Sequence, residues 1–200
     1  MALIPAIFLD KDGTLLADDP YNVDPARMRF ARGAYSGLRR LGSLGRPLIV
    51  ISNQPGVAFG RFDCEALDRV RVQLGRMFQE VGAQLDGFYY CPHHPRGIRG
   101  EYAIRCACRK PEPGLLLQAA RERNIDLEAS WFVGDILDDV EAGRRAGCRT
   151  LLLDNGNETE WHSGPLRVPE RIAPDLDAAA RLIESACRQE PATAAVWEAA

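Results

Sequence analysis

The chain has 200 residues, of which 46% are hydrophobic and 26% are charged, and its formal net charge is −3. This length fits a single domain with a substantial core, and the composition is that of an ordinary globular protein. A net negative charge without a basic block argues against a nucleic-acid surface. The longest apolar runs are strand-sized and no signal peptide stands at the start, so we expect a cytoplasmic protein that does not associate with membranes.

The first predicted element is the apolar run 6–9, which lies between Pro5 and Gly13 and predicts a buried strand. Asp10 and Asp12 follow it directly. Residues two apart on an extended chain point to the same side, so both carboxylates can flank one small group at the carboxyl end of the strand. Two carboxylates this close repel each other unless a cation intervenes, and Mg²⁺ shared with a phosphate is the simplest arrangement. An Asx-type turn is the alternative for this stretch taken alone.

Strand and helix patterns alternate along the rest of the chain. The polar, proline-broken segment 16–30 is expected to be a loop that lies over the site. Further strands are expected at 48–53, 87–92, 130–135 and 149–154. Helices are expected at 34–44, from the N-cap Asp63 to 81, at 113–123, at 138–146, and from Asp175 or Asp177 to 187.

Four of the predicted strands end in polar, chemically useful residues, namely Asp10, Ser52, Cys91 and Asp135. This arrangement is typical of an α/β fold with a doubly wound, Rossmann-like parallel sheet and one composite site along its carboxyl edge. We expect one domain over residues 1–188 and a loosely ordered, alanine-rich tail at 189–200.

The polar side chains after the first two predicted strands suit phosphate ester hydrolysis. Asp10 is the natural nucleophile, because a carboxylate is ionised at neutral pH and needs no base to activate it. Asp12 would protonate the leaving alkoxide and then deprotonate the water that hydrolyses the aspartyl-phosphate. Ser52 and Asn53 can hydrogen-bond phosphate oxygens.

A cation and further acids complete the predicted site. Lys110 supplies a compact positive charge. The chain has 25 lysines and arginines, but only Lys11 and Lys110 are lysines, and arginine does not replace a point-charge ammonium. Asp135 supplies a second Mg²⁺ carboxylate. Asp138 or Asp139 would lie one helical turn behind it and orient Lys110 or a metal-bound water.

A second motif has the pattern C-x-H, twelve residues, then C-x-C, and consists of Cys91, His93, Cys106 and Cys108. Three thiolates and one imidazole make a closed tetrahedral Zn²⁺ site. A closed site has no water to activate, so this zinc is expected to be structural and to hold the loop 91–108. That loop delivers Arg109 and Lys110, whereas the adjacent His94 is expected to be a non-ligand.

These motifs resemble those of the haloacid dehalogenase (HAD) superfamily. The corresponding residues, in family order, are Asp10-Lys11-Asp12-Gly13-Thr14, Ser52-Asn53, Lys110, and Gly134-Asp135 with Asp139. The resemblance implies that Mg²⁺ is held by the carboxylates of Asp10 and Asp135 and the backbone carbonyl of Asp12, with Asp139 behind these ligands. The second acid, Asp12, resembles the phosphatase branch, and no insertion is long enough for a large cap domain.

Within that superfamily the chain resembles the D-glycero-D-manno-heptose-1,7-bisphosphate 7-phosphatases and the related histidinol-phosphate phosphatases. The shared sequence motifs are Cys91-Pro92-His93-His94-Pro95, the segment 108–114 and Asn53-Gln54-x-Gly56. This resemblance implies a small phosphorylated sugar as substrate, the heptose bisphosphate of lipopolysaccharide precursor synthesis. Asn53, Gln54 and Lys110 would contact the substrate and Arg109 would recognise its distal part. The chain departs from the heptose enzymes at Ile136, where a lysine is expected.

Three other functions are compatible with parts of the sequence. The same chemistry could act on histidinol phosphate. A 3′-phosphatase for nucleic-acid ends would need a basic groove with stacking aromatics, which a net charge of −3 and 8% aromatic residues do not favour. A zinc-containing binding module with an inactive site is opposed by the intact pair of Asp10 and Asp12. We expect a monomer.

Overall fold

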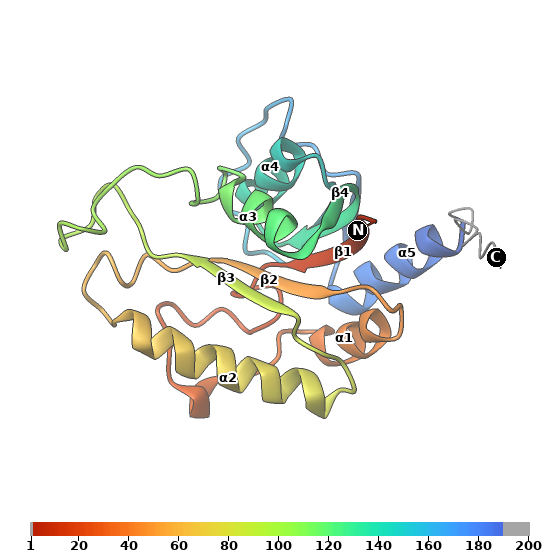
Figure 1. Cartoon of the computed structure of the whole chain (residues 1–200), viewed down its shortest axis with the longest axis horizontal. Coiled ribbons are helices and arrows are strands. Elements are labelled where there is room, and N and C mark those ends of the chain that lie inside the picture. The colour runs from red at the N-terminus through yellow and green to blue at the C-terminus, as the bar shows by residue number, and fades with distance from the viewer. Residues whose placement is uncertain (1, 190–200) are drawn as a thin grey trace, which may run out of the picture.

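The structure is a computed structural model that describes residues 2–189. The predicted tail at 189–200 therefore lies outside the described residues, apart from Gln189. Within the described range the chain forms one parallel α/β sheet with helices on both faces (Figure 1). No helix of the described range is both long and apolar enough to cross a membrane.

All neighbouring strands of the sheet are parallel. The six strands are β1 (Ile4–Leu9), β2 (Leu48–Asn53), β3 (Gly87–Cys91), β4 (Ile125–Gly134), β5 (Arg149–Leu153) and β6 (Arg171–Ala173). Their order is β3-β2-β1-β4-β5-β6. The chain therefore winds outward from β1 in one direction and then from β4 in the other. The carboxyl ends of β1 and β4 lie at the switch point, where doubly wound sheets bind ligands.

Helices cover both faces of this sheet. They are α1 (Ala34–Gly42), α2 (Cys64–Glu80), α3 (Gly114–Arg123), α4 (Leu137–Ala146) and α5 (Leu176–Gln189). Figure 1 shows α1, α2 and α5 on one face and α3 and α4 on the other. A long loop runs from β3 to α3 and projects beyond the carboxyl end of the sheet.

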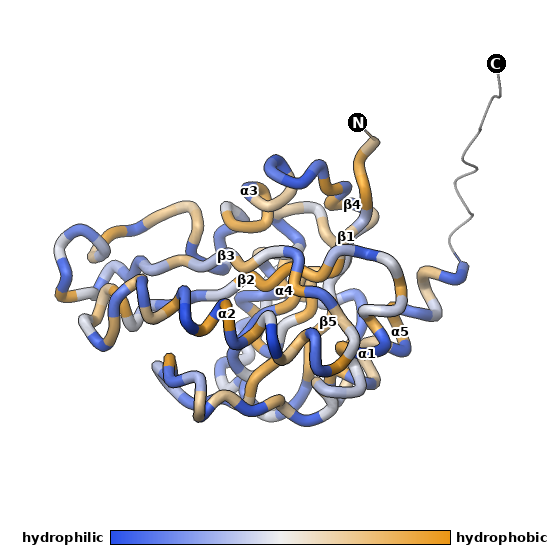
Figure 2. Tube along the Cα trace, turned by 60° about the horizontal axis from the view of Figure 1, so that its bottom comes forward, coloured by the Kyte–Doolittle hydropathy of each residue, from blue (hydrophilic) through white to orange (hydrophobic). Residues whose placement is uncertain are grey.

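The central strands are buried on both faces because alternate side chains enter two different cores. In β1, Ile7 and Leu9 pack in the core beneath α1, α2 and α5, whereas Ala6 and Phe8 pack in the core beneath α3 and α4. Figure 2 shows the corresponding apolar stretches in the middle of the molecule and polar stretches in the connecting loops. Polar side chains therefore lie in the loops at the strand ends, outside the two apolar cores.

Several helix boundaries follow the predicted local signals. The Asp63 carboxylate accepts a hydrogen bond of 2.9 Å from the backbone N–H of Ala66 and so caps α2. Gly147 ends α4 in the left-handed conformation, with φ of 92°. The Asp175 carboxylate accepts from the N–H of Ala178 at 3.0 Å, which decides the predicted start of α5 in favour of Asp175.

The structure also differs from the predicted elements. Strand β6 was not expected, because it has three residues and only Ala173 among them is buried, so it has no recognisable pattern. Strand β4 begins at Ile125 rather than at 130. The segment 16–30 contains a short 3₁₀ helix at Pro25–Arg27, and its ends are joined by a hydrogen bond from Ala17 N–H to the Arg29 carbonyl at 3.0 Å.

Candidate active site

Buried carboxylates gather at the carboxyl ends of β1 and β4. Asp10 follows β1, Asp135 follows β4, and Asp139 lies in the first turn of α4. One carboxylate oxygen of each lies within 4.8 Å of those of the other two, and all three residues are buried. The sheet topology therefore brings together acids that are far apart in the sequence.

Lys110 lies between two of these acids. Its Nζ atom donates a short hydrogen bond to Oδ1 of Asp10 and lies 2.5 Å from Oδ1 of Asp139. The Lys110 side chain is only 3% exposed. Burial lowers the pKa of Lys110, but the two carboxylates outweigh this effect and raise it above its usual value. Lys110 is therefore a buried ammonium rather than a surface lysine.

The buried charges do not balance, because three carboxylates face one ammonium. Burial raises the pKa of Asp10 well above its usual value despite the opposing effect of Lys110. Burial and then the neighbouring Asp139 raise the pKa of Asp135 to about 6. A divalent cation would remove this excess of negative charge, and carboxylate oxygens are the ligands that Mg²⁺ prefers. The donor set therefore fits Mg²⁺.

The Asp12 carboxylate has separate partners. Its Oδ1 pairs with the Nζ atom of Lys11 at 2.6 Å, and its Oδ2 accepts from Nε2 of Gln54 at 3.0 Å. The same Gln54 amide donates to Oγ of Ser52 at 2.7 Å. The Lys11 side chain is 1% exposed, so both lysines of this arginine-rich chain are buried in or beside the site. The sequence motif contains Lys11, but it did not predict a role for this residue.

Asn53 uses its side chain on the backbone of Lys110. Its Nδ2 donates to the Lys110 carbonyl at 3.1 Å, and its Oδ1 accepts from the Lys110 N–H at 3.0 Å. The sequence predicted a direct contact of Asn53 with phosphate. In the structure its amide oxygen and one N–H of Nδ2 bond to the backbone of Lys110 and so position that residue, and the contact with phosphate through the second N–H stays a prediction.

Two hydrogen-bond donors to Asp135 were not predicted as site residues. Oγ1 of Thr14 donates to Oδ1 of Asp135 at 3.0 Å, and Nδ2 of Asn157 donates to Oδ2 at 2.8 Å. The position of Asn157 just after β5, at the same sheet edge, is the signal that could have found it. Asp138 points elsewhere and pairs with Arg167 at 3.0 Å, so Asp139 is the acid that reaches Lys110.

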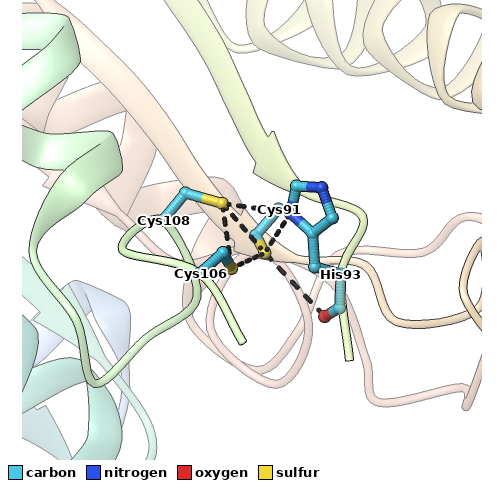
Figure 3. A group of neighbouring side chains, drawn as sticks. All are labelled: Cys91, His93, Cys106 and Cys108. Carbon is cyan, nitrogen blue, oxygen red and sulfur yellow. Dashed lines mark hydrogen bonds between the residues drawn. The ribbon is translucent and has the colours of Figure 1, made fainter. Parts of the chain in front are cut away.

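The predicted zinc ligands converge at the base of the projecting loop. Figure 3 shows Cys91, His93, Cys106 and Cys108 around one point, with their ligand atoms within 4.8 Å of one another. The sulfur of Cys108 lies 3.2 Å from that of Cys91 and 3.3 Å from that of Cys106, and Nδ1 of His93 lies 3.3 Å from it. Tetrahedral Zn²⁺ with Zn–S bonds of about 2.3 Å separates its sulfurs by about 3.8 Å, so these three sulfurs would move apart by about half an ångström to hold the ion.

The thiols of this cluster are electronically unequal. The hydrogen bond between the sulfurs of Cys91 and Cys108 is the main reason that the pKa of Cys108 falls to about 5 and that of Cys91 rises. A thiolate at neutral pH is the form that binds metal. The cluster is therefore a candidate metal site. His94 lies outside it and packs on the ring of Phe59, with 4.8 Å between the ring centroids.

A cavity of about 540 Å³ lies beside Lys110 and the metal-site loop. His94, Arg105, Arg109 and Lys110 contribute its basic lining, and Glu112 and Asp138 its acidic lining. The Nη1 atom of Arg109 is buried and has no hydrogen-bond partner among the described residues. Arg109 therefore lines the cavity and has a buried donor that no described residue satisfies.

Comparisons with known proteins agree with this architecture. A family model described as HAD-hydrolase-like matches residues 107–179. The D-glycero-β-D-manno-heptose-1,7-bisphosphate 7-phosphatase of Yersinia pestis is 41% identical over 150 residues, which cover 75% of this chain and 80% of the relative. The Escherichia coli K12 protein of the same name is 39% identical over 150 residues, which cover 75% of this chain and 78% of that protein.

A solved structure resembles the whole described fold. The D,D-heptose 1,7-bisphosphate phosphatase from B. bronchiseptica, complexed with magnesium and phosphate, is 30% identical and superimposes with a TM-score of 0.73. The match covers 93% of this chain and 99% of that one.

Proposed function

Because the chain belongs to the HAD-like hydrolases, in the family of the D-glycero-β-D-manno-heptose-1,7-bisphosphate 7-phosphatases, we propose that it removes the 7-phosphate of this heptose bisphosphate. The chemistry of phosphate monoester hydrolysis rests on one observation, the buried group of Asp10, Asp135 and Asp139 around Lys110. The sugar is proposed from the relatives and from the cavity lined by Arg105 and Arg109 beside that group.

Asp10 is proposed as the nucleophile. Its carboxylate oxygen attacks phosphorus, the ester P–O bond breaks, and an aspartyl-phosphate forms. The Lys110 ammonium, adjacent to Asp10, neutralises charge on the transferred group. The Ser52 hydroxyl, beside Gln54, is proposed to hydrogen-bond a phosphate oxygen.

Asp12 is proposed as the general acid and base. It gives its proton to the leaving alkoxide, and it then takes a proton from the water that attacks phosphorus and breaks the P–O bond to Asp10. Lys11 and Gln54 hold one oxygen of Asp12 each. They fix the carboxylate where both transfers can occur without its rotating away.

The carboxylates of Asp10 and Asp135 and the backbone carbonyl of Asp12 would hold Mg²⁺, with Asp139 behind them. When bound, the ion supplies charge neutralisation at the phosphate. The excess of buried carboxylates over ammonium groups supports this assignment.

We propose a structural role for Zn²⁺ at Cys91, His93, Cys106 and Cys108. A closed set of protein ligands leaves no position for a reacting water. The ion would fix the loop that presents Arg109 and Lys110 directly after Cys108. Arg109, with its unpartnered Nη1 atom, would bind the distal hydroxyl or phosphate oxygens of the substrate.

A panel of phosphate esters tests the substrate. We expect the highest kcat/KM with the β-anomer of D-glycero-D-manno-heptose 1,7-bisphosphate, and phosphate release at C7 by nuclear magnetic resonance. Histidinol phosphate and p-nitrophenyl phosphate serve as competitors. Preference for histidinol phosphate would refute the proposed sugar substrate but not the proposed phosphate ester hydrolysis. Inactivity on all esters with Mg²⁺ present would refute both. Ile136→Lys tests whether the missing lysine alters this ranking.

A further inference from the structure

The segment that follows β5 contacts both loops that carry the acids of the site. Nδ2 of Asn155 donates to the Gly13 carbonyl at 2.8 Å, and the Glu158 carboxylate accepts from the N–H of Leu137 at 2.6 Å. Gly13 belongs to the loop after β1, and Leu137 follows Asp135 at the start of α4. The residues 155–158 thus bridge the two strand ends between which Asp10 and Asp135 meet.

Asn157 is the member of this segment that contacts an acid of the site. Its Nδ2 donates to Oδ2 of Asp135 at 2.8 Å, while Thr14 donates to the other oxygen at 3.0 Å. One hydrogen bond on each oxygen fixes the plane of the carboxylate. Each oxygen still has a second lone pair for a cation, and a neutral amide does not repel that cation.

The backbone of Gly13 lies directly against this carboxylate and this amide. A Cβ atom at Gly13 would lie 2.0 Å from Oδ2 of Asp135 and 2.5 Å from Nδ2 of Asn157. The carboxylate and the amide therefore occupy the space that a side chain at position 13 would need. Asn155 also accepts from the Asn157 N–H at 3.2 Å, which orders the turn that presents the amide.

We propose that Asn157 is a positioning residue that fixes the Asp135 carboxylate for Mg²⁺, and that Asn155 and Glu158 brace it against the two loops. This inference rests on the proposed function, because it takes Asp135 as a ligand of the ion. Partners of a ligating carboxylate alter metal affinity by about 10–100-fold when they are removed. Asn157 touches no reacting group, so its loss acts on Mg²⁺ affinity.

The test compares Asn157→Ala with the wild type and with Thr159→Ala, an exposed neighbour in the same segment. Isothermal calorimetry measures Mg²⁺ binding to the metal-stripped full chain, and steady-state assays measure kcat against Mg²⁺ concentration. We expect about tenfold weaker Mg²⁺ binding in Asn157→Ala, an equal rise in the Mg²⁺ concentration for half-maximal rate, and kcat within about twofold at saturation. Thr159→Ala should match the wild type.

Three outcomes would overturn the proposal: equal Mg²⁺ affinity in Asn157→Ala and wild type, a lowered kcat at saturating Mg²⁺ with unchanged affinity, or no Mg²⁺ binding by the wild type. If Asn157→Ala does not fold, Asn157→Ser provides the same comparison with a smaller polar side chain. A wild type that binds Mg²⁺ but hydrolyses no ester would refute the proposed function alone, because calorimetry would still measure the effect of Asn157.

Discussion

The side-chain amide of Asn53 forms two hydrogen bonds with the backbone of Lys110, at 3.1 Å from Nδ2 to the carbonyl and at 3.0 Å from the N–H to Oδ1. Asn53 ends β2, whereas Lys110 lies in the last part of the long loop between β3 and α3. This pair therefore attaches the loop to the sheet at the point where the Lys110 ammonium enters the site.

Removal of this attachment should impair turnover. Asn53→Ala deletes both hydrogen bonds, and we expect kcat/KM to fall by about tenfold or more because a misplaced cation no longer matches the transition state. The fold should lose about 1–2 kcal/mol. Asn53→Asp retains an acceptor for the Lys110 N–H and should give an intermediate loss in steady-state assays. Equal kinetics in Asn53→Ala and wild type would refute the positioning role.

Asp10→Asn should abolish turnover while phosphate binding survives. The amide keeps the shape of the side chain and loses the nucleophilic charge, and loss of a covalent nucleophile costs several kcal/mol of barrier. Rates of ester hydrolysis and a phosphate-dependent shift in melting temperature measure the two effects. A variant that retained more than about a hundredth of the wild-type rate would contradict covalent catalysis.

Lys110→Arg should be damaging although it keeps the charge. A guanidinium is larger and planar, and the buried Nζ atom lies between Asp10 and Asp139 without room for it. Lys110→Met leaves two buried carboxylates uncompensated and should cost about 3–5 kcal/mol in Mg²⁺-free denaturant titrations. Arg71→Lys, at an exposed ion pair, is the matched control and should change stability by less than about 0.5 kcal/mol.

The proposed zinc site predicts one Zn²⁺ per chain by elemental analysis. Cys106→Ser should lose the ion, raise KM and lower kcat, because Arg109 and Lys110 follow the freed loop. Circular dichroism should change little, since the sheet has its own two cores. Cys64→Ser, outside the cluster, should keep the ion and the activity.

Two results would contradict this account of the loop. Wild-type protein without zinc would make the cluster an ordinary group of thiols. Activity that requires Zn²⁺ but not Mg²⁺ would make the zinc catalytic and would withdraw the metal role of Asp135.

Cys148 should resist alkylation in the folded protein. Burial raises the pKa of its thiol from 9.0 to about 12, so the reactive thiolate is scarce at pH 8.5. The folded state binds this proton more tightly than the unfolded state, so this group's contribution to stability falls as the pH rises above 9. Peptide mapping after iodoacetamide treatment should show Cys148 unmodified until denaturant is added. Rapid modification in native buffer would indicate that the core around α4 opens readily.

The sequence by itself determined the alternation of strands and helices and the polar residues at the strand ends. Those signals are local: apolar runs, N-cap Asp63, the glycine at 147 and the spacing of Cys91, His93, Cys106 and Cys108 are each legible within one segment. A parallel sheet collects its carboxyl ends at one edge, so the convergence of Asp10 and Asp135 was predictable as well.

Only the tertiary structure decided which side chains meet at that edge. Asp138 and Asp139 are adjacent in the sequence, yet only Asp139 reaches Lys110, because α4 begins with one of them turned toward the sheet and the other toward Arg167. Only the tertiary structure shows that Asn53 hydrogen-bonds to the backbone of Lys110 and that Asn157 hydrogen-bonds to the carboxylate of Asp135. These hydrogen bonds join segments that are distant in the chain, and no local periodicity encodes the direction of a side chain in a loop.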